Sequence, residues 1–339
     1  MSAVTIDNVS IVFGSHPEKA LPLMDEGQER PEIQQATGQV LGVHDCSIEV
    51  EEGEILVLMG LSGSGKSTLL RAINGLNPVV RGSVSIQTPD WSCDVTGASA
   101  EDLRRVRRES VAMVFQQFGL LPWRTVRENV GLGLELAGQS KAERTAKVDE
   151  QLALVGLSDW ADRKVGELSG GMQQRVGLAR AFVTDAPILL MDEPFSALDP
   201  LIRNRLQDEL LDLQQRLKRT IVFVSHDLDE AFKIGNRIAI MEGGRIVQCG
   251  TPKEIFSDPA NEYVADFVAH MNPLGVLTAA DVVEPGQGTG PDVASDMQIS
   301  DVMEMLSSGA DSCTVIENGA AMGKVTRTGL LKKLLDPRG

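Results

Sequence analysis

The sequence predicts an α/β protein built on a mainly parallel sheet. Apolar runs of strand length alternate with helical patterns from residue 54 onward, and this alternation is typical of parallel strands covered on both faces. The first run, residues 54–59, leads into a glycine-rich loop at residues 60–68 and then into a helix. Around this core we expect a small antiparallel β subdomain, a helical subdomain and a small α+β C-terminal appendage.

Length and composition exclude some classes of function. The chain has 339 residues, 42% of them hydrophobic, and a formal net charge of −16. The negative charge gives no support for a nucleic-acid partner. We expect no signal peptide, and no stretch approaches 18 uncharged apolar residues, so any membrane role is expected to need a partner subunit. The cysteines are far apart without metal-ligand spacing, as in a reducing cytosol; they are Cys46, Cys93, Cys249 and Cys313.

The N-terminal part predicts two strands of one small sheet with an insertion between them. Residues 4–12 alternate loosely between apolar and polar, and residues 41–50 form a second strand that turns into the first strand of the core. Between them, residues 15–40 carry three prolines and break the pattern. We expect this insertion to form two short helices, at residues 21–28 and 31–37.

The next part returns to strands and then becomes helical. Residues 82–87 alternate as a strand, residues 88–100 have the composition of a loop, and residues 111–115 form a buried strand. A charged helix is expected in between, at residues 100–109. The mostly helical block that follows is expected to form a subdomain at about residues 117–183; its helices are predicted at 125–137, 141–155 and 170–183.

The rest of the chain completes the core and then changes in composition. A first domain is expected over residues 1–271 and a C-terminal region over residues 272–339. The strands expected are 187–191, 220–224, 237–241, 245–249, 312–317 and 322–325, with helices at 200–218, 227–233, 251–270 (two), 299–307 and 329–335, and a flexible turn at 284–291.

Residues 60–68, Gly-Leu-Ser-Gly-Ser-Gly-Lys-Ser-Thr, match G-x-x-x-x-G-K-[ST] and predict a P-loop NTPase. Glycines let the backbone close around a phosphate where a Cβ would clash. Lys66 is expected to reach the β- and γ-phosphates, and the Ser67 hydroxyl to hold Mg²⁺. The alternative is a chance turn rich in glycine and serine. The expected nucleotide-binding residues here are Gly60, Ser62, Gly63, Ser64, Gly65, Lys66, Ser67 and Thr68.

Two carboxylates follow the apolar strand at residues 188–191. Asp192 stands at the strand end, where it can hold a water of the Mg²⁺ shell. Glu193 is placed to polarise a water in line with the γ-phosphate. An ordinary acidic turn is the alternative, and the P-loop upstream argues against it.

Residues 168–172, Leu-Ser-Gly-Gly-Met, open the helix at 170–183 and form a second candidate anion site. The alternative is a simple helix cap made by Ser169. One chain seldom needs two phosphate cradles for one nucleotide, whereas a head-to-tail dimer would use one from each copy. Taken alone, the motif favours the simple cap.

Six motifs of this chain occur in an order that resembles the ATP-binding subunit of an ABC transporter. They are the P-loop, Gln116, the 168–172 motif, the 188–194 motif, residues 196–199 (Ser-Ala-Leu-Asp) and residues 225–227 (Ser-His-Asp). The resemblance covers roughly residues 1–270. It implies a subunit that binds ATP and Mg²⁺, hydrolyses ATP and is peripheral to the cytoplasmic face of the membrane. The implied partners are a second copy of this chain, integral membrane permease subunits and, indirectly, an extracytoplasmic substrate-binding protein.

The resemblance also implies roles for single residues. Gln116 would sense Mg²⁺ and the γ-phosphate and couple to the membrane partner, and His226 would orient the attacking water. Phe13 would stack on adenine, although the insertion places it far from Gly60 in sequence and a core role is the alternative. The Mg²⁺ residues would be Ser67, Gln116 and Asp192. Contacts to the ATP of the opposite subunit would come from Ser169, Gly170, Gly171 and Asp199.

The insertion and residues 119–126, Gly-Leu-Leu-Pro-Trp-Arg-Thr-Val, are similar to those of the uptake group for choline, glycine betaine and proline. The likeness is closest to the choline-import ATPase subunit. Longer members of the group end in two CBS modules, whereas residues 297–335 amount to one. A dimer-packing appendage is the alternative for this tail.

We expect two copies to close around two ATP molecules and to reopen after hydrolysis, which would switch the permease. The alternatives are an importer of another small solute, a soluble ABC ATPase of repair or translation, and a regulatory module that binds nucleotide without hydrolysis. Glu193 and His226 argue against the last of these. No residue pattern identifies the solute, which rests on the resemblance alone.

Overall fold

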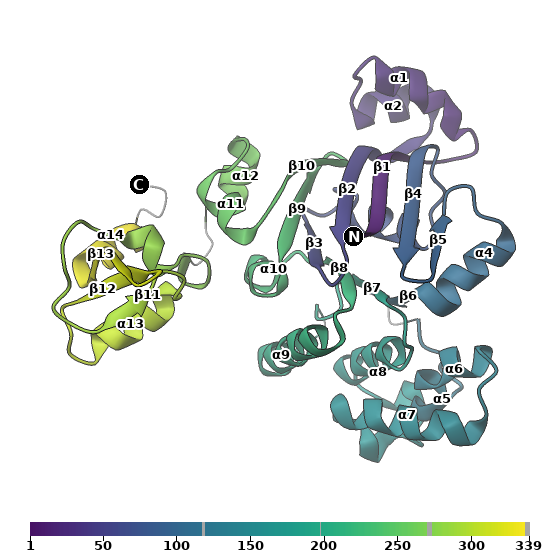
Figure 1. Ribbon diagram of the computed structural model, residues 1–339. Helices are drawn as coiled ribbons and strands as arrows, with labels where there is room; N and C mark the ends of the chain where they lie inside the picture. The colour runs from purple at the N-terminus through teal and green to yellow at the C-terminus, as the bar shows by residue number, and fades with distance from the viewer. Residues whose placement is uncertain (117–118, 197, 270–272, 336–339) are drawn as a thin grey trace. The chain divides into compact units, whose positions relative to one another are not determined.

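The computed structural model covers the sequence as two compact units (Figure 1). The first comprises Met1–His226 with Ala239–Val247, and the second Asp227–Ile238 with Gln248–Gly339. The expected domain boundary between residues 271 and 272 lies outside the described residues. The structure describes residues 1–116, 119–196, 198–269 and 273–335, so Ala197 of the predicted 196–199 motif is also outside them.

The N-terminal strands form a four-stranded antiparallel sheet in the order β2-β1-β4-β5. β1 (Ser2–Phe13) pairs with β2 (Val40–Glu51) on one side and with β4 (Arg81–Thr88) on the other. β5 (Trp91–Asp94) was not predicted, because it lies within residues 88–100, whose composition is that of a loop. Residues 89 and 90 instead form the turn of a hairpin, in which Thr88 pairs with Trp91.

The insertion between β1 and β2 is helical, as predicted. It contains a 3₁₀ turn, α1 (Leu21–Asp25) and α2 (Arg30–Thr37), which lie at one end of β1 and β2 (Figure 1). Ile33 is fully buried in a small cluster of apolar side chains from the insertion and the two strands. Arg81 of β4 forms an ion pair with Asp25 at 2.5 Å, so the insertion is also tied to the sheet by charge.

The core is a six-stranded sheet in the order β10-β9-β3-β8-β7-β6. The pairs β3–β8, β8–β7 and β7–β6 are parallel, as predicted. Every residue of β3, β7 and β8 is buried, which explains their continuous apolar sequences. The strands are β3 (Ile55–Met59), β6 (Val111–Val114), β7 (Ile188–Asp192), β8 (Thr220–Val224), β9 (Arg237–Glu242) and β10 (Arg245–Gly250).

The helical block packs around a hydrophobic cluster of its own, which includes Val126, Val148, Leu152 and Val176. The single helix expected at 125–137 is wrong, because Gly131 separates α5 from α6. The charged helix expected at 100–109 ends as a π-helical turn, Val106–Ser110. The helices are α3 (Lys66–Ile73), α4 (Ala100–Arg105), α5 (Val126–Val130), α6 (Leu132–Leu136), α7 (Lys141–Leu154), α8 (Gly170–Phe182) and α9 (Pro200–Leu217).

The second unit contains α10 (Leu228–Ile234), α11 (Pro252–Ser257) and α12 (Glu262–Phe267), followed by a small α+β fold. In this fold a three-stranded sheet has the order β11-β12-β13. β11 (Asp292–Ala294) was not predicted; it has only three residues, and its pairing with β12 comes from tertiary contact. The other elements are β12 (Ser312–Glu317), β13 (Ala320–Thr326), α13 (Ile299–Ser307) and α14 (Arg327–Leu335). Across the described ranges, no helix has both the length and the apolar character needed to span a bilayer.

Candidate functional site

The glycine-rich loop lies between β3 and α3 and can take its shape only with glycine at key positions. Gly60, Gly63 and Gly65 have φ values of +139°, +79° and +105°. A Cβ on Gly60 would lie 2.1 Å from the Met241 carbonyl oxygen, and one on Gly65 would lie 2.7 Å from that of Gly42. The loop is thus closely packed against β9 and β2, with its backbone N–H groups at the start of α3.

Lys66 is held inside this loop. Its side chain is buried, and its Nζ donates to the carbonyl oxygens of Gly60 at 2.8 Å and Leu61 at 2.9 Å. Burial lowers the pKa of Lys66, and the nearby carboxylates of Glu193 and Asp192 oppose that shift. Two neutral carbonyls are weak partners for an ammonium group, so a phosphate would be a stronger one.

Asp192, at the end of β7, is fully buried. Its Oδ1 accepts a hydrogen bond from the Ser67 Oγ at 2.6 Å, and its Oδ2 is paired with the Arg71 guanidinium at 2.9 Å. The structure therefore brings together the two residues predicted to hold Mg²⁺ from the P-loop and from β7. Hydroxyl and carboxylate oxygens are the ligands that Mg²⁺ prefers.

Glu193 joins three of the predicted residues. Its Oε2 lies 3.2 Å from the Gln116 Nε2 and 3.2 Å from the His226 Nδ1. Gln116 follows β6, Glu193 follows β7 and His226 follows β8, so all three stand at the carboxyl ends of neighbouring parallel strands. The Glu193 side chain is 18% exposed and that of His226 is 61% exposed, so the carboxylate is sheltered while water can still approach it.

The backbone at Glu193 is in the left-handed region, with a φ of +48°. Such a residue costs about 1–3 kcal/mol and persists only where its surroundings fix it. Here the Glu193 N–H donates to the Val224 carbonyl at 3.1 Å, and its carbonyl accepts from the Ser196 Oγ at 3.0 Å and the Gln174 Nε2 at 3.4 Å. These bonds hold the left-handed backbone at Glu193, which no sequence pattern had indicated.

Phe13 lies beside the P-loop helix despite the insertion. It pairs with Val40 across β1 and β2, and its ring is partly exposed. A Cβ on Gly42 would lie 2.8 Å from the Phe13 ring and 3.1 Å from the methyl group of Thr68. The insertion is looped out from the two strands, so the sequence distance between Phe13 and Gly60 does not separate them in space.

The second predicted anion site, at residues 168–172, has fewer contacts than the P-loop. Ser169 caps α8 by accepting from the Met172 N–H at 3.4 Å, and Asp199 caps α9 by accepting from the Ile202 N–H at 3.1 Å. Ser169, Gly170 and Asp199 are exposed. Within the described part of the chain, no hydrogen bond joins this segment to the P-loop.

The residues present fit a magnesium nucleotide. The Ser64 Oγ is buried in the P-loop and has no hydrogen-bond partner among the residues that the structure describes, as expected of a group whose partner is a ligand. Over residues 1–116, 119–196, 198–269 and 273–335, no group of three His, Cys, Asp or Glu side chains could hold a metal. A metal beside Ser67 and Asp192 would therefore need phosphate and water oxygens for the rest of its shell.

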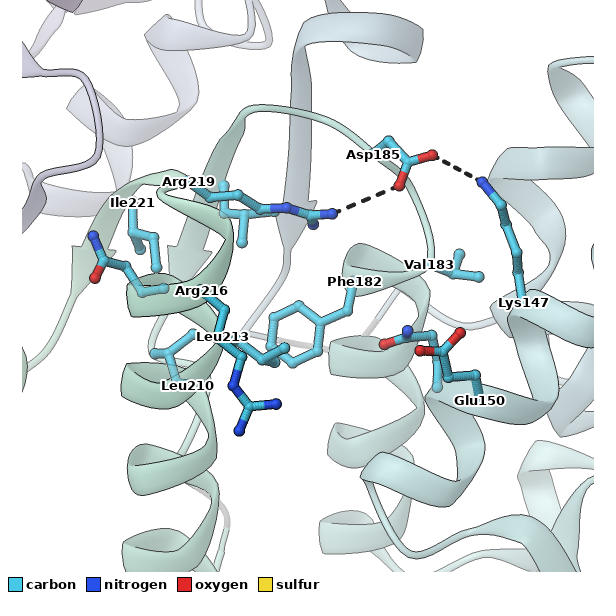
Figure 2. A pocket seen from close by; sticks show the side chains of 13 residues that line it. Lys147, Glu150, Phe182, Val183, Asp185, Leu210, Leu213, Arg216, Arg219 and Ile221 are labelled. Atoms are coloured by element: carbon cyan, nitrogen blue, oxygen red, sulfur yellow. Dashed lines mark hydrogen bonds and ion pairs between the residues drawn. The ribbon is translucent and has the colours of Figure 1, made fainter.

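A separate hollow of about 330 Å³ lies between α7, α8 and α9 (Figure 2). Asp185 bridges it, with one carboxylate oxygen 2.8 Å from the Lys147 Nζ and the other 3.8 Å from the Arg219 guanidinium. Its floor is apolar, with Phe182 and Leu213 facing inward (Figure 2). None of the predicted nucleotide-site residues lines it, so it is a seam between the helical block and the core rather than part of the site.

Sequence reasoning missed several residues around the site. Arg71 could have been found, since it lies one helical turn after Ser67 on α3 and thus on the same face. Gln174 and Arg30 reach the site only through tertiary packing, so no local signal identifies them.

Comparison with known proteins agrees with this geometry. Residues 43–196 match the family model described as "ABC transporter". The glycine betaine/proline betaine transport system ATP-binding protein ProV of Escherichia coli is 51% identical over 277 residues, which are 82% of this chain and 68% of ProV. The glycine betaine/carnitine transport ATP-binding protein GbuA of Listeria monocytogenes is 44% identical over 340 residues, covering 99% of this chain and 83% of GbuA.

Among solved structures, the chain is similar to the ATP-binding cassette MJ0796 in a dimeric, post-hydrolysis state bound to ADP and Pi. The TM-score is 0.63 at 31% identity, over 74% of this chain and 98% of that one. The match covers a P-loop fold with the mixed sheets described above, and so the predicted ABC ATPase fold is confirmed.

Proposed function

Because the chain belongs to the ABC transporter family, as an ATP-binding subunit that couples ATP hydrolysis to transport, we propose that it drives uptake of a quaternary ammonium compound. The observation that carries the ATP-hydrolysis part of this proposal is the meeting of Gln116, Glu193 and His226 beside Lys66 and Asp192. The choice of solute rests on the similar transport proteins alone. Glycine betaine is the first candidate solute, since ProV and GbuA are both named for it. Choline and proline betaine are the next candidates.

The chemical step is a displacement at the γ-phosphorus. A water oxygen attacks phosphorus, the bond to the ADP oxygen breaks, and Glu193 accepts the proton of the water. His226 orients that water, and Lys66 exchanges its two carbonyl partners for phosphate oxygens. Mg²⁺, held by Ser67 and through water by Asp192, with Gln116 nearby, would neutralise the charge of the phosphates. Phe13 would stack on adenine.

Each nucleotide is shared between two copies of the chain. One copy supplies the P-loop, and its partner supplies Ser169, Gly170, Gly171 and Asp199 to the γ-phosphate side. Ser169 and Asp199 are both exposed, and the neutral cap at Ser169 leaves its helix N-terminus able to attract a phosphate. Closure is favoured by the γ-phosphate and is released after hydrolysis. We assign residues 272–339 to regulation or to dimer packing.

The membrane subunit docks beside Gln116. Phe115 and Gly119, which flank Gln116, line a hollow of about 330 Å³ together with Leu132, Leu136 and Met113. Leu136 is 72% exposed, although it is large and apolar. We assign this hollow to a cytoplasmic segment of the permease with an apolar face, which places the chain at the cytoplasmic side of the membrane. An extracytoplasmic binding protein would deliver the solute.

The test is co-purification with the membrane subunit, followed by uptake of radiolabelled glycine betaine and choline in cells that lack this chain. The parent should co-purify and restore uptake, and Leu136→Arg should lose both. Trp160→Arg is a matched control, since Trp160 is a large apolar residue that is 40% exposed and lies outside the hollow. A chain that hydrolyses ATP but never associates with a membrane protein would instead support a soluble ABC ATPase. Restored uptake of a different solute only would change the substrate assignment.

A further inference from the structure

We infer that Arg30, carried by the insertion, is a positioning residue that holds the phosphate-binding loop in its binding conformation. The inference rests on the proposed nucleotide site and adds a role for the insertion. The Arg30 Nη1 donates to the Gly63 carbonyl oxygen at 2.7 Å, and its Nη2 donates to that of Gly42. One guanidinium group thus links α2, the P-loop and β2.

The guanidinium occupies a slot between glycines. A Cβ on Gly244, in the turn between β9 and β10, would lie 2.5 Å from the Arg30 Nη2. Burial lowers the pKa of Arg30, and its Nε is buried without a hydrogen-bond partner among the described residues. Arg30 is half-buried, and fixing a side chain as flexible as arginine costs conformational entropy, which its two hydrogen bonds offset.

The helix that carries Arg30 is firmly built. Glu29 and Glu32 form a capping box around its first turn, and Pro31 stands at its start. Ile33 is buried in the cluster beneath the insertion. Arg30 therefore projects from a rigid first turn rather than from a loose loop.

Gly63 is the part of the P-loop that most needs such a support. It is exposed, its φ is +79°, and among the described residues no atom lies within 4 Å of the position of a Cβ on it. Gly60 and Gly65 are instead packed against β9 and β2. Because glycine is flexible, the peptide at Gly63 would sample other orientations without Arg30, and ATP would then have to order it on binding.

This role predicts a split between binding and chemistry. Without Arg30 the KM for ATP should rise about tenfold, since the lost hydrogen bonds come from a charged donor. The kcat should stay within about twofold, because Lys66, Glu193 and His226 keep their own contacts. A variant that only unfolds more easily would lower the active fraction and leave KM unchanged.

The experiment measures ATPase kinetics of the full chain with its membrane subunit for the parent, Arg30→Met and Arg30→Lys. Arg30→Lys keeps the charge and one donor, so its KM should fall between the other two. Arg81→Met is the matched control: it removes the ion pair that ties the insertion to β4 but leaves the P-loop contact in place.

An unchanged KM in Arg30→Met, or an equal rise in Arg81→Met, would overturn the inference. If Arg30→Met does not fold, Arg30→Lys alone decides, through its KM and through amide hydrogen exchange at residues 61–65, which should be faster than in the parent. A parent without ATP turnover would refute the proposed function instead, so the two failures are distinguishable.

Discussion

The P-loop and the segment from Ser169 to Gly171 are both glycine-containing helix starts, yet they differ in burial and in the side chains around them. The P-loop encloses a buried lysine and adjoins a fully buried aspartate that is paired with Arg71. The Ser169 segment is exposed at its first two residues, and the structure shows a single cap at its serine. Both can attract an anion through helix N–H groups. Only the first also supplies a cation and oxygen ligands for a metal.

The difference supports the proposal that one copy of the chain holds a cradle, the P-loop with Asp192, and a lid, residues 169–171, that act on different nucleotides. The cradle is preorganised, because Lys66 and Asp192 are already fixed by hydrogen bonds. The lid lacks partners in its own P-loop within the described residues. In the proposed arrangement the lid acts on the nucleotide of another copy, and so the two regions should respond differently to substitution.

The largest effect should come from Glu193→Gln, on the cradle side. The amide keeps the shape of the side chain but cannot accept a proton, so kcat should fall about 10³-fold. ATP binding and dimer closure should persist. The measurement is steady-state hydrolysis together with size-exclusion chromatography in ATP. Glu101→Gln, at an exposed position of α4, is the control. Hydrolysis at the parent rate would refute the assignment of Glu193 as base.

A mixing experiment tests whether the cradle and the lid of one copy act on different nucleotides. Lys66→Ala should abolish phosphate binding by the cradle. Ser169→Glu should prevent the lid from closing, because it places a carboxylate against the γ-phosphate bound to the partner copy. A carboxylate is compatible with a helix N-terminus, so Ser169→Glu should still fold. Each variant alone should lose about 100-fold in activity.

Mixed in equal amounts, these two variants should recover activity. Half of the dimers then contain one intact composite site, which gives about a quarter of the parent rate for independent sites. The readout is ATPase rate against mixing ratio, with a maximum near equality. A mixture as inactive as its components would show that each nucleotide belongs to one chain.

The sequence identified the residues of the P-loop and of the Ser169 segment, but it did not identify the structural surroundings in which they lie. The P-loop, Asp192, Glu193 and Ser169 lie in contiguous motifs whose chemistry is local. The left-handed backbone at Glu193 and the pairing of Arg71 with Asp192 depend on the neighbouring strands, which no local pattern encodes. The two missed strands are three and four residues long and owe their existence to the strand beside them.

The position of Phe13 is another case in which the sequence alone does not show a contact made by strand pairing. Residues 15–40 separate Phe13 from the second strand in sequence, but antiparallel pairing brings it opposite Val40. Sequence distance is a poor guide wherever an insertion is looped out between two paired strands. The helices of the insertion were predictable from its prolines, whereas the contact of Arg30 with the P-loop was not.

Variants of the two regions should also differ in their free energy of unfolding, by less than they differ in ATPase activity. Arg71→Met leaves the buried Asp192 carboxylate without its ion pair. Arg71 is itself 39% exposed, so the cost should be about 2 kcal/mol, below that of breaking a fully buried pair. Ser169→Ala removes a long, exposed cap bond and should cost about 0.5 kcal/mol. Urea denaturation at constant slope measures both. Equal losses would contradict the contrast drawn between the buried cradle and the exposed lid.

The smallest effect should be a pH dependence confined to the cradle. Burial lowers the pKa of Lys66 in the folded protein, so the unfolded chain binds more protons between that value and the ordinary lysine pKa. Stability without nucleotide should therefore rise with pH in this window, by at most about 1.4 kcal/mol per pH unit.

Other groups act in the opposite direction, such as Cys46, whose pKa burial raises to about 11. The difference between the parent and Lys66→Met cancels them. This difference should grow in favour of the parent as pH rises, and it should flatten when ATP is present, because phosphate pairs with the ammonium group. The corresponding difference between the parent and Ser169→Ala should stay constant, since serine does not titrate. Urea midpoints over a series of alkaline pH values give both differences, and a flat Lys66 difference without ATP would show that the lysine is not desolvated in the cradle.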